Sequence, residues 1–380
     1  MTKDRLAELD IMRGIAFILV VIQHTFGGYS FIKDISLENR LISKFIYSIG
    51  KTAVPIFVSL TAICLIYVYY DRMDVLNFYI KKLKFLILPY IFCSLINDLI
   101  LHHSTYGFTN FIGQIVTGNS AYHLWYMGMI IRLYLYIPLI FLFIKKLNST
   151  STFIKKSFFI FSFVLYYLIL KNNNYVTSTI GKLLFGTPSK LQQSFINITP
   201  LLWIFYFVVG AYMIFNYTNL KVMIKKYKYA LIGGYTILLS YFYYDDIKDF
   251  IGNPLPFIKF DHALYIVYVT TAIIFFYMLS LYIDTASKKI SILLSFIGKY
   301  SFPAYMLHII VIQTWSGMIP STHYLYSPLI KLLVTIIITP IICCIISYIP
   351  GSKYLIGVRS KFKNKSIKQI YNSTEIKNKC

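Results

Sequence analysis

Most of the chain alternates between long runs of apolar residues and short polar stretches. A helix needs about 20 mostly apolar residues to cross the hydrocarbon core of a bilayer. The pattern therefore predicts an all-α, polytopic membrane protein with about ten transmembrane helices, over residues 11–29, 46–70, 85–101, 122–144, 153–170, 196–217, 229–244, 262–283, 290–315 and 328–349. Residues 1–350 would form one transmembrane domain. Residues 351–380 would form a basic cytoplasmic tail that contacts anionic lipid headgroups.

The ninth segment is less regular than the others. Gly298, Lys299 and Pro303 interrupt it, and proline removes a helical hydrogen bond. It is expected either as one span or as a short interfacial helix followed by a span.

The overall composition agrees with a membrane protein and excludes other classes. Hydrophobic residues make up 57% of the chain and charged residues 13%, which is more apolar surface than one soluble core would bury. The net charge of +23 lies in clusters between apolar runs, where it is typical of membrane topology and not of a nucleic-acid-binding face. The five cysteines have no metal-binding spacing, so no metal site is expected.

The distribution of Lys and Arg predicts the orientation. Roughly three times as many basic residues fall on the side that holds both termini as on the opposite side. Because basic loops stay in the cytoplasm, both termini are expected there. The enrichment in Lys, Ile, Asn and Tyr is typical of an AT-rich bacterial genome, so the expected location is the bacterial plasma membrane, with several passes. The opposite loops 171–195 and 245–261 combine turn formers, aromatic residues and carboxylates, which suit a sugar, although plain solvated loops would look similar.

Arg13 and His24 are ionisable residues inside the first apolar run. Their separation of 11 residues is about three helical turns, so they share one helix face about 16 Å apart. Arginine binds phosphates with a planar fork of donors, and histidine exchanges protons near neutral pH. The pair suggests one track through the lipid for a substrate with a phosphorylated head and a distant reactive end, as in coenzyme A thioesters. The alternative is an arginine that reaches the headgroups and a histidine that bonds a neighbouring helix.

Four stretches together resemble one known family. Arg13 followed by His24 in LDIMRGIAFILVVIQH resembles the R-x10-H signature of the acyltransferase 3 family of integral membrane O-acyltransferases. Three more stretches resemble its later motifs, in the same order: YIKKLKFLILPY, HLWYMGMIIRLYLYIPL and IGKYSFPAYMLH.

The resemblance implies an enzyme that moves an acetyl or succinyl group from cytoplasmic acyl-CoA to a hydroxyl of an extracytoplasmic polysaccharide of the cell envelope or biofilm. His24 would act as general base or carry the acyl group transiently, and Arg13 would bind the donor phosphates. The expected partners are acyl-CoA, the glycan, membrane lipid and the glycan synthase machinery. No permanently bound cofactor is expected.

The resemblance also implies supporting residues. Lys81, Lys82 and Lys84 stand where the family has R-x-x-R, and lysine binds phosphate as a point charge rather than as a fork. Arg132 would help to bind the donor or pair with a carboxylate. The residues expected to contact the acceptor are His123, Trp125, Tyr126, Tyr300, Ser301 and His308. Positive-inside charge, an interfacial aromatic belt and helix-to-helix hydrogen bonds are the alternatives for these groups.

Two other functions remain open at this point. An exporter of a surface polysaccharide or a lipid-linked sugar would also carry intramembrane charges and external aromatic loops. Another kind of membrane acyltransferase would place its essential histidine late in the chain, at His308 rather than His24.

Overall fold

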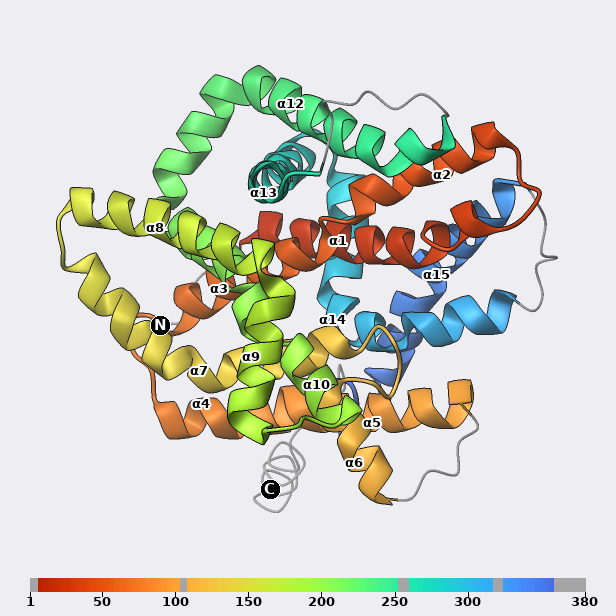
Figure 1. The fold of residues 1–380 in the computed structure, drawn as a ribbon, viewed down its shortest axis with the longest axis horizontal. Helices are drawn as coiled ribbons and strands as arrows, with labels where there is room; N and C mark the ends of the chain where they lie inside the picture. Colours follow the sequence, from red (N-terminus) through yellow and green to blue (C-terminus); the bar gives the residue numbers. More distant parts are fainter. Residues whose placement is uncertain (1–5, 103–107, 252–259, 317–323, 359–380) are drawn as a thin grey trace, which may run out of the picture.

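The computed structural model describes residues 6–102, 108–251, 260–316 and 324–358, and within these ranges every regular element is a helix. The α-helices are α1 (Ala7–Phe26), α2 (Leu37–Gly50), α3 (Ala53–Tyr69), α4 (Val75–Lys82), α5 (Leu88–Asn97), α6 (Phe108–Thr117), α7 (Trp125–Asn148), α8 (Thr152–Lys171), α9 (Asn173–Phe185), α10 (Lys190–Asn197), α11 (Ile204–Phe215), α12 (Tyr217–Ile247), α13 (His262–Ala286), α14 (Lys288–Ser316), α15 (Tyr326–Ile346) and α16 (Ser352–Leu355) (Figure 1). The predicted all-α class is confirmed. Most of the expected basic tail, residues 359–380, lies outside the described residues.

Nine helical segments in the described part of the chain are long and apolar enough to cross a membrane. They are Ala7–Phe31, Leu37–Tyr69, Val75–Leu101, Trp125–Asn148, Thr152–Lys171, Lys190–Phe215, His262–Ala286, Lys288–Thr314 and Tyr326–Ile346. The remaining expected span, residues 229–244, lies in α12 and is not among them. Its apolar stretch is short and rich in tyrosine, lies between Lys228 and Asp245, and follows a kink at Tyr227.

Polar residues at helix starts explain several boundaries. A side chain there accepts a hydrogen bond from a backbone N–H that has no helical partner. This occurs at α2, α4, α8 and α13, through Ser36, Asp74, Ser151 and Asp261. At Asp74 the backbone N–H of Asn77 stabilises the carboxylate and lowers its pKa below the usual value.

Helix α1 lies in the middle of the molecule, where it packs against α2, α3, α13, α14 and α15 (Figure 1). The ninth expected span proves to be one continuous helix, α14, with Pro303 inside it. Helices α1 and α14 approach closely at two glycines: a Cβ atom on Gly298 would lie 1.9 Å from the carbonyl oxygen of Asp10, and one on Gly14 would lie 2.3 Å from that of Leu294. This contact fixes Arg13 beside α14.

Replacing Gly298 with alanine is expected to destabilise the protein, because the added methyl group collides with backbone that cannot turn aside. Such overpacking typically costs about 1–3 kcal/mol or more. The melting temperature of the detergent-solubilised protein measures the effect. Gly233→Ala is the matched control, since a Cβ atom there meets nothing within 4 Å and alanine favours the helix. Equal melting temperatures for the two variants would contradict the close α1–α14 contact.

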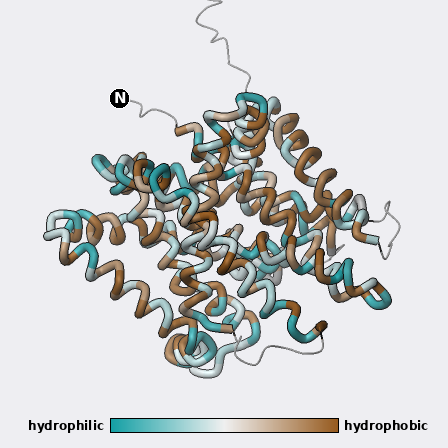
Figure 2. The backbone as a smooth tube through the Cα atoms, turned by 90° about the horizontal axis from the view of Figure 1, so that it is seen from above, coloured by the Kyte–Doolittle hydropathy of each residue, from teal (hydrophilic) through white to brown (hydrophobic). Residues whose placement is uncertain are grey.

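Apolar residues lie both inside the bundle and on its outer surface. Figure 2 shows hydrophobic residues along most of the helices, including those at the outer edges. Only 6% of the apolar part of α8 is buried, so most of this helix faces outward. An exterior of this kind is stable only against lipid, which agrees with a polytopic membrane protein.

Candidate active site

Three histidines from distant parts of the chain meet inside the bundle. His24 lies near the end of α1, His123 just before α7 and His308 in α14. The ring centroids lie 5.1 Å apart for His24 and His308, 4.8 Å for His123 and His308, and 6.3 Å for His24 and His123. His123 is 1% exposed and His308 is fully buried, whereas His24 is partly exposed. Only His24 of the histidine cluster is therefore open to an incoming group.

Backbone hydrogen bonds fix the proton positions of the two buried rings. His308 Nδ1 lies 2.7 Å from the carbonyl oxygen of Tyr305, and His123 Nε2 lies 3.3 Å from that of Met306. Because a carbonyl oxygen can only accept, each of these nitrogens donates. In the neutral rings the lone pairs then lie on His308 Nε2 and His123 Nδ1. Neither atom has a hydrogen-bond partner in the described structure.

These two unpartnered nitrogens indicate what the cluster accommodates. An unsatisfied polar atom in a buried position costs about 1–3 kcal/mol. A hydroxyl or another proton donor that reaches these nitrogens would remove that cost. The cluster therefore has two nitrogens that can accept hydrogen bonds, next to the partly exposed His24. Within the described residues, no set of His, Cys, Asp and Glu has metal-binding geometry.

Arg13 lines a cavity of about 400 Å³ between α1, α3, α7 and α14. Its Nη1 atom donates to Oδ1 of Asp10 at 2.5 Å, and its Nη2 atom lies 2.7 Å from Sγ of Cys64. The Arg13 side chain remains about one-third exposed. Ser301 and Lys299 of α14 line the same cavity, and the Oγ atom of Ser301 donates to the carbonyl oxygen of Gly298.

A second cavity, of about 420 Å³, adjoins the first and is lined by Lys81 and Lys82. The two cavities share three lining residues: Leu86, Tyr134 and Phe302. The Lys82 ammonium lies 4.5 Å from the ring centroid of Tyr134, within cation–π distance. Lys84 is exposed and lines neither cavity. We call the two cavities together the cationic tract.

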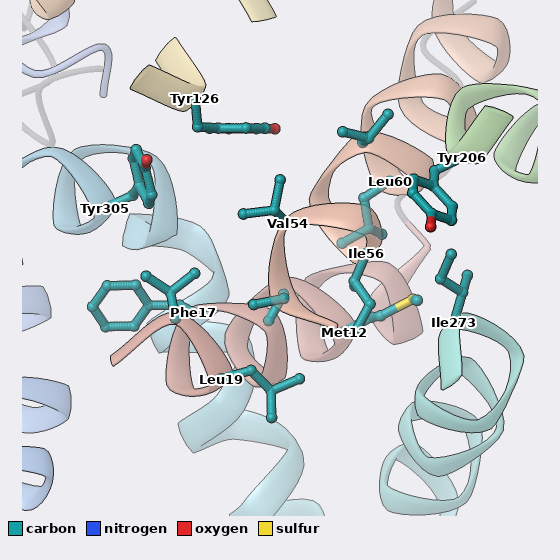
Figure 3. Packing of buried hydrophobic residues seen from close by; sticks show 14 of the residues in the cluster. Met12, Phe17, Leu19, Val54, Ile56, Leu60, Tyr126, Tyr206, Ile273 and Tyr305 are labelled. Carbon is teal, nitrogen blue, oxygen red and sulfur yellow. The ribbon is translucent and has the colours of Figure 1, made fainter. Parts of the chain in front are cut away.

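Tyr305 lies between the cationic tract and the histidine cluster. Tyr126 and Tyr305 line the first cavity, with ring centroids 5.4 Å apart, and both are visible in Figure 3. Tyr305 also lies 5.7 Å from the rings of His123 and His308, and its hydroxyl donates to the carbonyl oxygen of His123. The lining of the cavity does not include His24. In the described part of the chain, the cavity that holds Arg13 therefore ends at Tyr305 beside the cluster and does not itself extend to His24, unlike the single track expected from the sequence.

Three other expected site residues line neither cavity of the cationic tract: Arg132, Trp125 and Tyr300. Arg132 donates to the backbone carbonyl oxygens of Phe195 in α10 and Val116 in α6, so it braces these helices against α7, and it lines neither cavity of the tract. Trp125 packs against Trp203, with ring centroids 5.2 Å apart. Tyr300 is buried, and its hydroxyl lies 3.3 Å from Oγ of Ser347.

The structure also adds residues that the sequence argument did not single out. Lys299 and Tyr305 line the first cavity, and both lie within the late motif IGKYSFPAYMLH, where a helical periodicity places Tyr305 beside His308. Tyr134 and Cys64 line it as well. No sequence signal distinguishes these two from the many other tyrosines and the apolar cysteines of the spans.

A histidine cluster next to a cation-lined cavity offers groups that can exchange a proton and bind an anion. The chain matches the acyltransferase 3 family, described as an acyltransferase domain, over residues 6–348. It belongs to this family and is a membrane acyltransferase. Among curated proteins and among solved structures, no match reaches significance.

Proposed function

We propose that the protein transfers an acetyl or succinyl group from cytoplasmic acyl-CoA to a hydroxyl of an extracytoplasmic polysaccharide, with His24 at the centre of the reaction. The observation that carries the proposal is the position of the histidine cluster, which lies one tyrosine ring beyond the cationic tract. A phosphorylated donor in the tract would bring its far end to the cluster.

The cationic tract suits the nucleotide end of coenzyme A. Arg13, Lys81, Lys82 and Lys299 line it, and Asp10, its one lining carboxylate, is already paired with Arg13. The excess of positive charge favours phosphate groups. Arg132 has no part in this proposal, because it lines neither cavity of the cationic tract.

The thioester reaches the cluster once Tyr305 turns aside. The acceptor hydroxyl then attacks the thioester carbonyl, a C–O bond forms, the C–S bond breaks, and coenzyme A leaves as a thiolate. As general base, His24 takes the hydroxyl proton and returns it to the thiolate. In the alternative route, the His24 imidazole attacks first and passes the acyl group on from an acyl-imidazole. In both routes the free lone pairs of His123 and His308 accept hydrogen bonds from the acceptor.

A finer resemblance suggests the acceptor. The stretches WIFYFVVGAYMIFNY and LKFLILPYI resemble the membrane protein of the staphylococcal poly-N-acetylglucosamine (intercellular adhesion) system. We therefore propose poly-N-acetylglucosamine, or a closely similar surface glycan, as the acceptor in a bacterial plasma membrane.

Inside-out membrane vesicles test the proposal, because their outer face corresponds to the cytoplasm. Radiolabelled acetyl-CoA or succinyl-CoA is supplied outside, and glycan oligosaccharide is enclosed in the lumen. We expect labelled ester on the enclosed glycan only when the protein is present. No label, together with transport of newly made glycan into the lumen, would favour an exporter instead.

Replacing Lys82 with glutamine is expected to raise the KM for acyl-CoA about tenfold with little change in kcat, because one phosphate-binding charge of the tract is lost. Lys84→Gln is the matched control: it removes the same charge two residues away, but outside both cavities. Initial rates in the vesicle assay give both constants. A larger KM effect at Lys84 than at Lys82 would contradict the assignment of the donor to the tract.

A further inference from the structure

A separate groove lies between α7, α8 and α11, away from the histidine cluster. Its volume is about 430 Å³, within the range of roughly 300–1,000 Å³ that is usual for ligand sites. It shares no lining residue with the cationic tract. Nothing in the proposed acyl transfer uses this groove.

The groove is apolar along its length and basic at one end. Side chains such as Ile144, Phe159 and Phe207 form its walls, whereas Lys155 and Lys156 line it near the start of α8. The ends of α7 and α11 add polar groups at the same place, through Asn148 and Asn216. An amphiphile with one charged end fits this distribution.

The two lysines of the groove have no counter-charge in the described structure. No carboxylate forms an ion pair with Lys155 or Lys156, and no Asp or Glu lines the groove. The neighbouring contacts place this end of the groove near the donor entrance: Asn148 donates to the hydroxyl of Tyr70, and the adjacent Tyr69 lines the second cavity of the tract. Both sites therefore open at the end of the bundle that the charge distribution assigns to the cytoplasm.

We propose that this groove binds an anionic glycerophospholipid of the cytoplasmic leaflet. The headgroup phosphate contacts Lys155 and Lys156, and an acyl chain lies along the apolar walls. The outward-facing surface of α8 supplies the route, since lipid in the bilayer reaches the groove without crossing water. Basic residues next to a membrane favour anionic headgroups over zwitterionic ones.

Native mass spectrometry of the full-length protein in detergent tests this assignment. The protein is titrated with phosphatidylglycerol or phosphatidylcholine of equal chain length, and the lipid-bound fraction is measured. We expect clear preference for phosphatidylglycerol. The double variant Lys155→Gln, Lys156→Gln is expected to bind phosphatidylglycerol about tenfold more weakly and to lose the preference.

The matched control is the double variant Lys145→Gln, Lys146→Gln. It removes two exposed charges near the C-terminal end of α7, and neither lysine lines the groove. It should retain the lipid preference. An equal loss in both double variants, or no preference in the wild-type protein, would overturn the proposal. Competition by inorganic phosphate or by glycerophosphoglycerol as strong as that by the intact lipid would overturn it too, because the site would then bind an anion and not a lipid.

Discussion

Replacing His24 with glutamine is expected to lower acyl transfer roughly 10²- to 10⁴-fold, the usual contribution of a general acid–base group. His24 is the partly exposed member of the histidine cluster, and the other two rings are buried with one nitrogen each committed to a backbone carbonyl. Glutamine keeps much of the size and hydrogen-bonding capacity of histidine but cannot exchange a proton at neutral pH. The rate of ester formation in the vesicle assay measures the effect.

Other histidines of the chain provide the comparison for His24. His262→Gln removes a histidine at the start of α13, where it packs against Phe260, outside the cluster, and should leave the rate unchanged. His308→Gln and His123→Gln should lower the rate by smaller factors, because these rings are proposed to position the acceptor. If His308→Gln abolished transfer while His24→Gln did not, the late histidine would be the catalytic one and the proposed roles would be wrong.

The spans could be predicted from sequence because length and apolarity alone decide which helices suit a bilayer. The predicted spans differed from the structure where hydrophobic composition does not decide where a helix begins or ends. The stretch 229–244 is apolar in sequence and was predicted as a separate span. In the structure it is the second part of the longer kinked helix α12, whose first part begins at Tyr217 and carries several lysines. Pro303 did not end its helix: α14 continues through it beside the close contact of Gly298 with α1.

The candidate site was predictable only where the relevant residues share one helix. The common face of Arg13 and His24 follows from the helical repeat. That Tyr305 separates the cavity from the histidines depends on how α14 packs against α1, and no local pattern encodes it. Arg132 illustrates the opposite case: an intramembrane arginine suggests a functional site, but α6 and α10 fold back and supply backbone carbonyl oxygens to two of its nitrogens, outside the cationic tract.

Replacing Arg13 with glutamine is expected to raise the KM for acyl-CoA about tenfold to a hundredfold, which corresponds to one or two hydrogen bonds between charged groups. Only two guanidinium nitrogens of Arg13 are engaged, by Asp10 and Cys64, so further N–H donors remain available to a phosphate in the cavity. Arg13→Lys keeps the charge but loses the planar fork, and an intermediate KM is expected.

Arg132→Gln distinguishes a loss of donor binding from a general loss of intramembrane charge. Arg132 braces α6 and α10 from outside the cationic tract, so its replacement should lower the melting temperature of the protein while the folded fraction keeps a normal KM for acyl-CoA. Arg13→Gln should raise the KM for acyl-CoA, and it should lower the melting temperature as well, because the buried carboxylate of Asp10 loses its ion pair with Arg13. If both variants raised KM equally, or if Arg13→Gln lowered only kcat, the phosphate groups of the donor would not bind at Arg13. The phosphate groups would then have to be bound by the remaining lining cations, Lys81, Lys82 and Lys299, which bind phosphate without the bidentate geometry of arginine.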